Sequence, residues 1–172
     1  GGAAAWGYCW REELDCGTCV QYCDEGKSEY PCESGKYYQG RGPLMLKMNY
    51  NYGAFSKVAF GDKTVLLHDP SRVAHDPVLS FRSAIWLWMT PQGPKPSCHA
   101  VITGAWQPTP ADEKKGRMPG YGMTTNILNG REECGTGDKV EERVAFFRRS
   151  AGIFGVGIDE ATLYCDQVTP YS

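Results

Sequence analysis

Residues 76–91 read DPVLSFRSAIWLWMTP, and this stretch predicts a helix with a defined start and a defined end. Asp76 is a suitable N-cap and Pro77 fits the first helical turn. Pro91 ends the pattern, because proline lacks an N–H donor and restricts the residue before it. We expect one buried stripe along this helix, made of apolar residues that fall on one face: Val78, Phe81, Ile85, Trp88 and Met89.

Further helices are predicted on the C-terminal side of this stretch. Thr109-Pro110 is a second capped start followed by acidic residues, and Gly130 is expected to close a helix over 122–129 in the left-handed position. An amphipathic surface helix is expected from the spacing of Val140, Val144, Phe147 and Ala151. The fold class is therefore predicted to be mostly helical, with loops and at most a short hairpin over residues 1–43.

The bulk composition indicates one ordinary globular domain. The chain has 172 residues, of which 41% are hydrophobic and 22% are charged. A net charge of -2, without a local run of Lys and Arg, argues against nucleic-acid binding. Apolar runs fall short of the roughly 20 residues that a membrane span needs, so we expect no membrane contact. The first residues do not form a signal peptide as they stand, so a secreted protein would be present here in a mature or incomplete form.

Eight cysteines are a high, even count for this length and favour a disulfide framework made in an oxidising compartment. Cys16 and Cys19 also have the spacing of a redox or zinc pair, although their turn-rich surroundings favour disulfide use. The histidines, His68, His75 and His99, are isolated from other ligand types, so we expect no metal. Phosphate-binding and dinucleotide motifs are missing from the sequence, and no cofactor is expected.

Several strings occur in the order known from one plant enzyme family. They are WGYC at 6–9, GRGP at 40–43, NYNYG at 49–53, WLWMTP at 86–91, KPS at 95–97, VITG at 101–104, PGYG at 119–122, TNI at 125–127, NG at 129–130 and ECG at 133–135. On these strings, which run along almost the whole chain, the sequence resembles the plant-type chitinases of glycoside hydrolase family 19.

The resemblance implies a mostly helical, lysozyme-like α+β fold stapled by disulfides. It implies that residues 1–172 are a single chitinase-like domain lacking the family's N-terminal segment. The family binds chitin and other β-1,4-linked N-acetylglucosamine chains in a long cleft and hydrolyses them with inversion, using two carboxyls roughly 6.5–9.5 Å apart. A monomeric plant defence protein, secreted or vacuolar, is the expected context.

The resemblance also implies part of the disulfide pattern. Cys23 with Cys32, and Cys134 with Cys165, stand where the family makes bridges. The family partner of Cys9 would lie upstream of this sequence, and Cys16 and Cys19 are additional cysteines, so the pairing of all three is open. Cys98 is expected to be a lone buried thiol.

Catalysis by the family needs a general acid and a general base. The acid lies in a His-Glu-Thr-Thr-Gly-Gly segment that would fall before or at Gly1, so no residue of the sequence matches it. Two explanations stay open: the first part of the protein is missing from the sequence, or the chain lacks the proton donor. Glu13, four residues after Cys9, falls on the general-base position, and the alternative is a solvated surface acid.

Two departures occur where the family positions sugar and water. Met45 stands in place of a Gln that contacts sugar, and Lys47 in place of a Ser that helps to hold the attacking water. A thioether cannot replace the donors and the acceptor of an amide. A lysine beside Glu13 would make the carboxylate a weaker base and would occupy the place of the water, unless it extends to solvent instead. Gln39 and Ala100 are lesser departures from the family pattern.

Other positions retain the residues that the family uses to bind sugar. By resemblance these are Asn51, Lys95, Asn129, the aromatic platform Tyr30, and Arg143, which orients a catalytic carboxylate. Asn129 could instead be a helix-end residue, and Arg143 a surface partner of Glu141 or Glu142.

Three functions follow from these residues. The first is a chitinase-like lectin or defence protein that binds N-acetylglucosamine oligomers, with hydrolysis lost or strongly impaired. The second is an active endochitinase whose general acid lies in a segment outside this sequence. The third is a structural or storage protein that kept only the fold. Retained sugar contacts together with Met45 and Lys47 favour the first.

Overall fold

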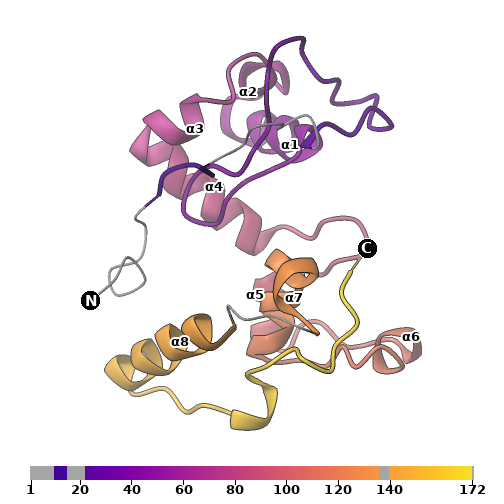
Figure 1. Ribbon diagram of the computed structural model, residues 1–172, viewed down its shortest axis with the longest axis vertical. Helices are drawn as coiled ribbons and strands as arrows, with labels where there is room; N and C mark the ends of the chain where they lie inside the picture. The colour runs from indigo at the N-terminus through magenta and orange to yellow at the C-terminus, as the bar shows by residue number, and fades with distance from the viewer. Residues whose placement is uncertain (1–9, 15–21, 136–139, 172) are drawn as a thin grey trace. The chain divides into compact units, whose positions relative to one another are not determined.

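The computed structural model describes residues 10–14, 22–135 and 140–171, and these are mostly helical (Figure 1). They fall into two compact units, residues 1–87 and residues 88–172. Outside the helices, the described backbone pairs only through isolated bridges, such as those of Arg41 with Glu12 and with Leu46. Among the described residues, no helix is both long enough and apolar enough to cross a membrane.

The first unit is built around helices α1 (Asn49–Phe60), α2 (Thr64–His68) and α3 (Arg72–His75) and most of α4 (Pro77–Met89). Gly61 ends α1 in the left-handed conformation, and its N–H bonds to the carbonyl of Lys57. Buried Ser56 then joins α1 to α2, because its hydroxyl donates to Asp62 O and accepts from Leu66 N. The core of this unit consists of Tyr38, Leu46, Tyr52, Phe55, Leu66, Leu67, Val73, Leu79 and Leu87.

Helix α4 begins as the sequence predicts but buries a different face. Asp76 accepts a hydrogen bond from Leu79 N at 3.0 Å, which confirms the start. The predicted buried stripe is wrong, because Leu79, Ser83 and Leu87 are buried, whereas the exposed residues are Val78 (69%), Phe81 (53%), Ile85 (64%) and Met89 (47%).

The reason for this difference is shape rather than hydrophobicity. A Cβ added to Gly42 would lie 2.9 Å from Ser83 Oγ and 3.2 Å from Ser80 O, so the loop at Gly42 lies almost against the helix backbone. The small side chains of the serines permit that close approach. A prediction based on the spacing of apolar residues does not take serines into account. Trp88, expected in the buried stripe, and its neighbour Trp86 are half-buried, and each packs against the core cluster of its own unit.

The second unit contains α5 (Cys98–Ile102), α6 (Pro110–Glu113), α7 (Tyr121–Glu133), α8 (Val140–Phe154) and the 3-10 helix η3 (Glu160–Thr162). The capped start at Thr109 is confirmed, since Thr109 and Asp112 form a reciprocal capping box at α6. The amphipathic helix is confirmed as well: α8 buries Val140, Val144 and Ala151. Phe147 stacks on Tyr121 with ring centroids 4.0 Å apart.

The expected left-handed helix end at Gly130 is wrong, because Gly130 is not among the described glycines with positive φ and α7 continues to Glu133 beyond a kink at Asn129. Gly130 lies inside α7, and the irregular residue is Asn129, whose φ of -151° and ψ of 34° are not helical. Gly130 is required for a packing reason: a Cβ there would lie 2.2 Å from Asn126 Oδ1.

The disulfide predictions are confirmed where the structure describes them. Cys23 bonds to Cys32, and Cys134 bonds to Cys165. Cys98 is a buried free thiol, and burial raises its pKa to about 12, so it stays protonated and unreactive. Cys9, Cys16 and Cys19 lie outside the described residues.

The packing at Gly130 gives a stability prediction. Gly130→Ala should lower the free energy of unfolding by about 1–3 kcal/mol, because the added methyl overpacks against Asn126. The matched control is Gly152→Ala in α8, where a Cβ meets nothing within 4 Å and better helix propensity should add about 0.5–1 kcal/mol. Urea unfolding followed by circular dichroism measures both, and a gain in stability for Gly130→Ala would contradict the packing.

Candidate functional site

A tight turn of the first unit carries the candidate site around Glu13. Leu46 N donates to Arg41 O at 2.8 Å, and Arg41 N donates to Leu46 O at 3.1 Å, which closes the turn. Gly42 adopts φ 77° inside it, a conformation that favours glycine. The turn also pairs with residues 11–13, since Gly42 N donates to Arg11 O at 2.9 Å.

The side chain of Arg41 anchors this turn from inside the unit. Only 6% of Arg41 is exposed, and Nη1 donates to Tyr37 O at 3.0 Å and to the Tyr52 hydroxyl at 2.9 Å. Its Nε lies 3.4 Å from Glu12 Oε2, an ion pair without hydrogen-bond geometry. Tyr52 donates in turn to Gln39 O at 2.8 Å. Burial raises the pKa of Tyr52, so the phenol stays neutral and keeps its proton for that bond.

Glu13 is held through its backbone and through both carboxylate oxygens. Its N–H donates to Gly40 O at 2.8 Å, and Gly40 N donates back to Glu13 Oε2 at 3.1 Å. The hydroxyl of Tyr22 donates to Glu13 Oε1 at 2.7 Å. Glu13 is therefore part of an ordered site in the first unit and not a freely solvated surface acid.

Met45 lies near this carboxylate, and Lys47 lies over the ring of the tyrosine that bonds to it. Lys47 Nζ stands 5.9 Å from the ring centroid of Tyr22, the residue that donates to Glu13. The position of a Cβ on Gly40 would be 2.9 Å from Met45 Cβ and 3.4 Å from Glu13 Oε2. A thioether thus lies near the proposed base, and a cation lies over the ring of the tyrosine that donates to it.

The backbone around Lys47 is unusual. Met45 has φ 50° and Met48 has φ 77°, both in the positive region that side-chain-bearing residues avoid. Each such residue costs on the order of 1–3 kcal/mol, and such strain clusters at functional sites. Asn51, which is 8% exposed, donates from Nδ2 to Lys47 O at 2.9 Å and helps to hold the segment.

Tyr30 packs against helix α1 at Gly53. A Cβ on Gly53 would lie 2.2 Å from Tyr30 Cδ1, so the tyrosine ring packs directly on the helix. Lys63 Nζ lies 5.9 Å from its ring centroid, and burial raises the pKa of Tyr30. The ring is half-buried here, and its use as a sugar platform stays a prediction.

The second unit holds a separate polar cluster centred on Glu133. This carboxylate is 3% exposed and accepts from Arg143 at Oε2 (2.7 Å) and Oε1 (2.5 Å), and from Asn129 Nδ2 at 3.0 Å. Burial lowers the pKa of Arg143, but the hydrogen bonds and charge of Glu133 outweigh it and hold that pKa above its ordinary value. Arg143 is therefore paired with Glu133 and not with Glu141 or Glu142, and Asn129, at the kink of α7, also bonds to Glu133.

Lys95 contacts the same helix that carries Asn129. Its Nζ donates to Ile127 O at 3.2 Å and lies 5.9 Å from the ring centroid of Tyr171. The candidate residues thus gather in two groups, one within each unit: Glu13, Met45, Lys47 and Asn51 in the first, and Lys95, Asn129 and Arg143 in the second.

Two members of these groups were missed by sequence reasoning. Glu133 had a usable signal, because it follows Asn129 by four residues and so shares a helix face with it. Tyr22 had none beyond its place before Cys23, since its contact with Glu13 depends on the path of the intervening loop. Among residues 10–14, 22–135 and 140–171, no group of three His, Cys, Asp or Glu side chains is placed to hold a metal.

Known proteins match this chain in sequence and in fold. Residues 1–165 match the family described as chitinase class I, glycoside hydrolase family 19. Endochitinase A2 of Pisum sativum is 49% identical over 172 residues, covering 99% of this chain and 51% of the relative. Inactive chitinase-like protein 1 of Hevea brasiliensis is 50% identical over 172 residues, covering 99% of this chain and 52% of the relative.

Solved structures agree with the fold. A family 19, class IV chitinase from Zea mays superposes with a TM-score of 0.69 at 27% identity, covering 90% of this chain and 64% of that one. The chain spans about half the length of the curated relatives it matches.

The buried pair in the second unit can be tested by removing its charge. Glu133→Gln should cost stability toward the lower end of the roughly 3–5 kcal/mol typical of broken buried pairs, because Arg143 is still 29% exposed. Glu160→Gln breaks the exposed Arg148–Glu160 pair and should leave the unfolding midpoint unchanged. Equal effects of the two substitutions, measured by urea unfolding, would contradict a buried structural role for Glu133.

Proposed function

Because the chain belongs to glycoside hydrolase family 19, the class I chitinases, we propose that it is a chitinase-like protein that binds N-acetylglucosamine oligomers and hydrolyses them poorly or not at all. A role in plant defence and a secreted or vacuolar location are parts of the same proposal. The disulfides Cys23–Cys32 and Cys134–Cys165 support that location, since such bonds persist in oxidising compartments.

Sugar binding is supported by the ordered polar groups of both units. The amide of Asn129 is fixed by Glu133, which leaves its carbonyl oxygen oriented as an acceptor for a sugar N–H or O–H. Asn51 is likewise fixed by Lys47 O. Preorganised polar groups of this kind bind at a smaller entropic cost than mobile ones.

Impaired hydrolysis is supported by one observation above the others: the Lys47 ammonium stands over the ring of Tyr22, whose hydroxyl donates to Glu13. A general base must accept a proton from water, and here both oxygens of Glu13 already accept hydrogen bonds. Loss of general-base assistance costs about 10²–10⁴-fold in rate.

Sequence identity does not separate binding from catalysis in this family. The relatives above include one named endochitinase and one named inactive chitinase-like protein, at 49% and 50% identity. The distinction therefore has to come from individual residues, and Met45 and Lys47 are the departures that lie near Glu13 or over the ring of its tyrosine donor.

An active endochitinase that cuts β-1,4 links with inversion is the second candidate. The retained Glu13, with two hydrogen-bond donors, and the buried Glu133–Arg143 pair favour it. Both candidates share the sugar-binding groups, but the endochitinase also needs a general acid from a segment outside this sequence.

Binding and cleavage can be measured on one sample. Titration calorimetry of the chain with chitohexaose should give saturable binding, whereas cellohexaose, which lacks the N-acetyl groups, should bind much more weakly. Proton NMR of the saturated sample over several days should show an intact hexamer. No heat with chitohexaose would contradict sugar binding, and new reducing ends, α-anomer first, would establish the endochitinase instead.

The role of Lys47 is tested with a substrate whose leaving group needs no proton. Hydrolysis of a chitooligosaccharyl fluoride should be slow in the wild-type chain and rise on the order of 10²-fold in Lys47→Ser, because removal of the cation frees Glu13 to activate water. Lys57→Ser, which removes an exposed charge from α1, is the matched control and should change nothing.

Adding Glu13→Gln to Lys47→Ser should abolish the gain. Fast release of fluoride by the wild-type chain, or a gain that survives Glu13→Gln, would show that Lys47 does not silence this carboxylate.

A further inference from the structure

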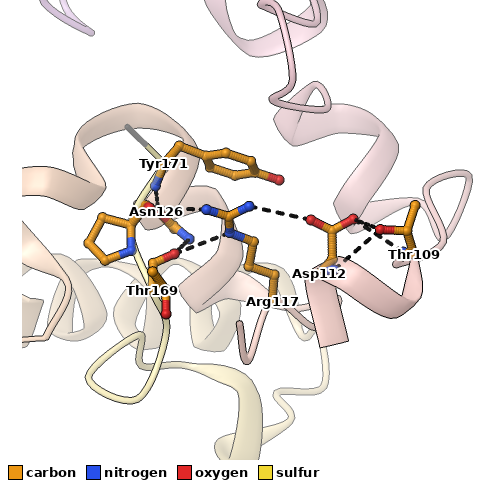
Figure 2. A network of polar contacts seen from close by, with 7 residues as sticks. Thr109, Asp112, Arg117, Asn126, Thr169 and Tyr171 are labelled. Carbon is orange, nitrogen blue, oxygen red and sulfur yellow. Dashed lines mark hydrogen bonds and ion pairs between the residues drawn. The ribbon is translucent and has the colours of Figure 1, made fainter. Parts of the chain in front are cut away.

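A backbone segment far along the chain, residues 169–171, is bound tightly within the second unit. Arg117 Nε donates to Thr169 O at 3.1 Å, and Nη2 donates to Pro170 O at 3.0 Å (Figure 2). Thr169 N donates to Lys115 O at 2.9 Å. The backbone of this segment thus accepts hydrogen bonds from Arg117 and donates one to Lys115.

Arg117 is itself fixed on all sides. It is 5% exposed, and its guanidinium lies 3.7 Å from the ring centroid of Tyr171. Nη1 pairs with Asp112 Oδ1 at 3.5 Å, and Figure 2 shows Asp112 and Thr169 on opposite sides of the guanidinium. A buried charge requires such pairing, and its partners are correspondingly held in place.

The same segment reaches helix α7 through Asn126, which is fully buried. Asn126 Oδ1 accepts from Tyr171 N at 3.3 Å, and its Nδ2 lies 3.5 Å from Thr169 O (Figure 2). Asn126 Oδ1 also fills the space where a Cβ of Gly130 would stand. Asn129, which directly precedes Gly130, is the residue at which α7 departs from helical geometry.

The ring of Tyr171 makes a second connection to α7. It belongs to the core formed with Cys98, Val101, Met123 and Ile127. Lys95 Nζ lies 5.9 Å from its centroid and donates to Ile127 O. Tyr171 therefore packs beside Lys95 and against the helix that carries Asn129. It is not itself one of the candidate sugar-binding residues.

From these contacts we propose that Tyr171 is a positioning residue for oligosaccharide binding. With Arg117 and Asn126, it fixes the irregular turn of α7 and thereby the orientation of the Asn129 amide and the Lys95 ammonium. The effect on sugar affinity rests on the proposed function, whereas the effect on Asn129 and on Arg143, which shares the Glu133 carboxylate with it, does not require a ligand.

The test compares three variants of the full chain. Tyr171→Leu removes the ring, Tyr171→Phe keeps it, and Thr169→Ala alters only an exposed side chain whose backbone makes the contacts. Tyr171→Leu should shift the NMR signals of the Asn129 side-chain amide and of Arg143 Nε–H, and should weaken chitohexaose binding roughly tenfold. Tyr171→Phe and Thr169→Ala should leave the signals and the affinity at wild-type values.

The outcomes separate this proposal from the previous one. A folded Tyr171→Leu variant with unchanged signals and affinity overturns it. If that variant does not fold, Arg117→Lys, which keeps the charge but loses the two-pronged contact, should move the same two signals, and unmoved signals overturn the proposal. A wild-type chain that binds no chitohexaose disproves sugar binding, while the NMR comparison still decides the positioning role.

Discussion

The region around Glu13 depends on one buried charge, the guanidinium of Arg41. Removing such a group from water costs several kcal/mol unless it is paired, and here Tyr37 O, the Tyr52 hydroxyl and the Glu12 carboxylate surround it. Because these partners come from three separate segments, satisfying Arg41 brings them together. The turn at 41–46 then lies against residues 11–13, and Glu13 is paired with Gly40 through backbone and side chain alike.

Two positions of this region, Met45 and Lys47, differ from the family pattern, and the region is still held by hydrogen bonds. Lys47 and Met45 lie on a segment with two positive-φ residues, and Asn51 still holds that segment through Lys47 O. The carboxylate of Glu13 is therefore held in an ordered frame, with a thioether near it and an ammonium over the ring of its tyrosine donor. The proposal of sugar binding without efficient cleavage rests on this combination.

Features governed by local chemistry were predictable from the sequence, and those governed by three-dimensional shape were not. The start of α4 at Asp76, the capping box at Thr109 and the α8 stripe follow from short-range rules, and two disulfides followed from the family resemblance. The buried face of α4 was predicted wrongly, because the loop at Gly42 packs closely against Ser83. The helix therefore buries the face with Ser83 and not the more apolar face. Gly130 was taken for a helix end, although it makes room for Asn126 inside α7. The candidate site residues were named by resemblance; their partner Glu133 had a local signal, four residues after Asn129, whereas Tyr22 reaches Glu13 only through the path of the intervening loop.

The central claim is that a lysine ammonium takes the place of the catalytic water beside Glu13, and a crystal structure of the chain with an N-acetylglucosamine oligomer tests it most directly. The account predicts that Lys47 Nζ lies between the sugar and the Tyr22–Glu13 pair, with no ordered water on Glu13 facing the anomeric carbon. A Lys47 side chain extended into solvent, with a water bonded to Glu13 and in line with the glycosidic bond, would contradict it.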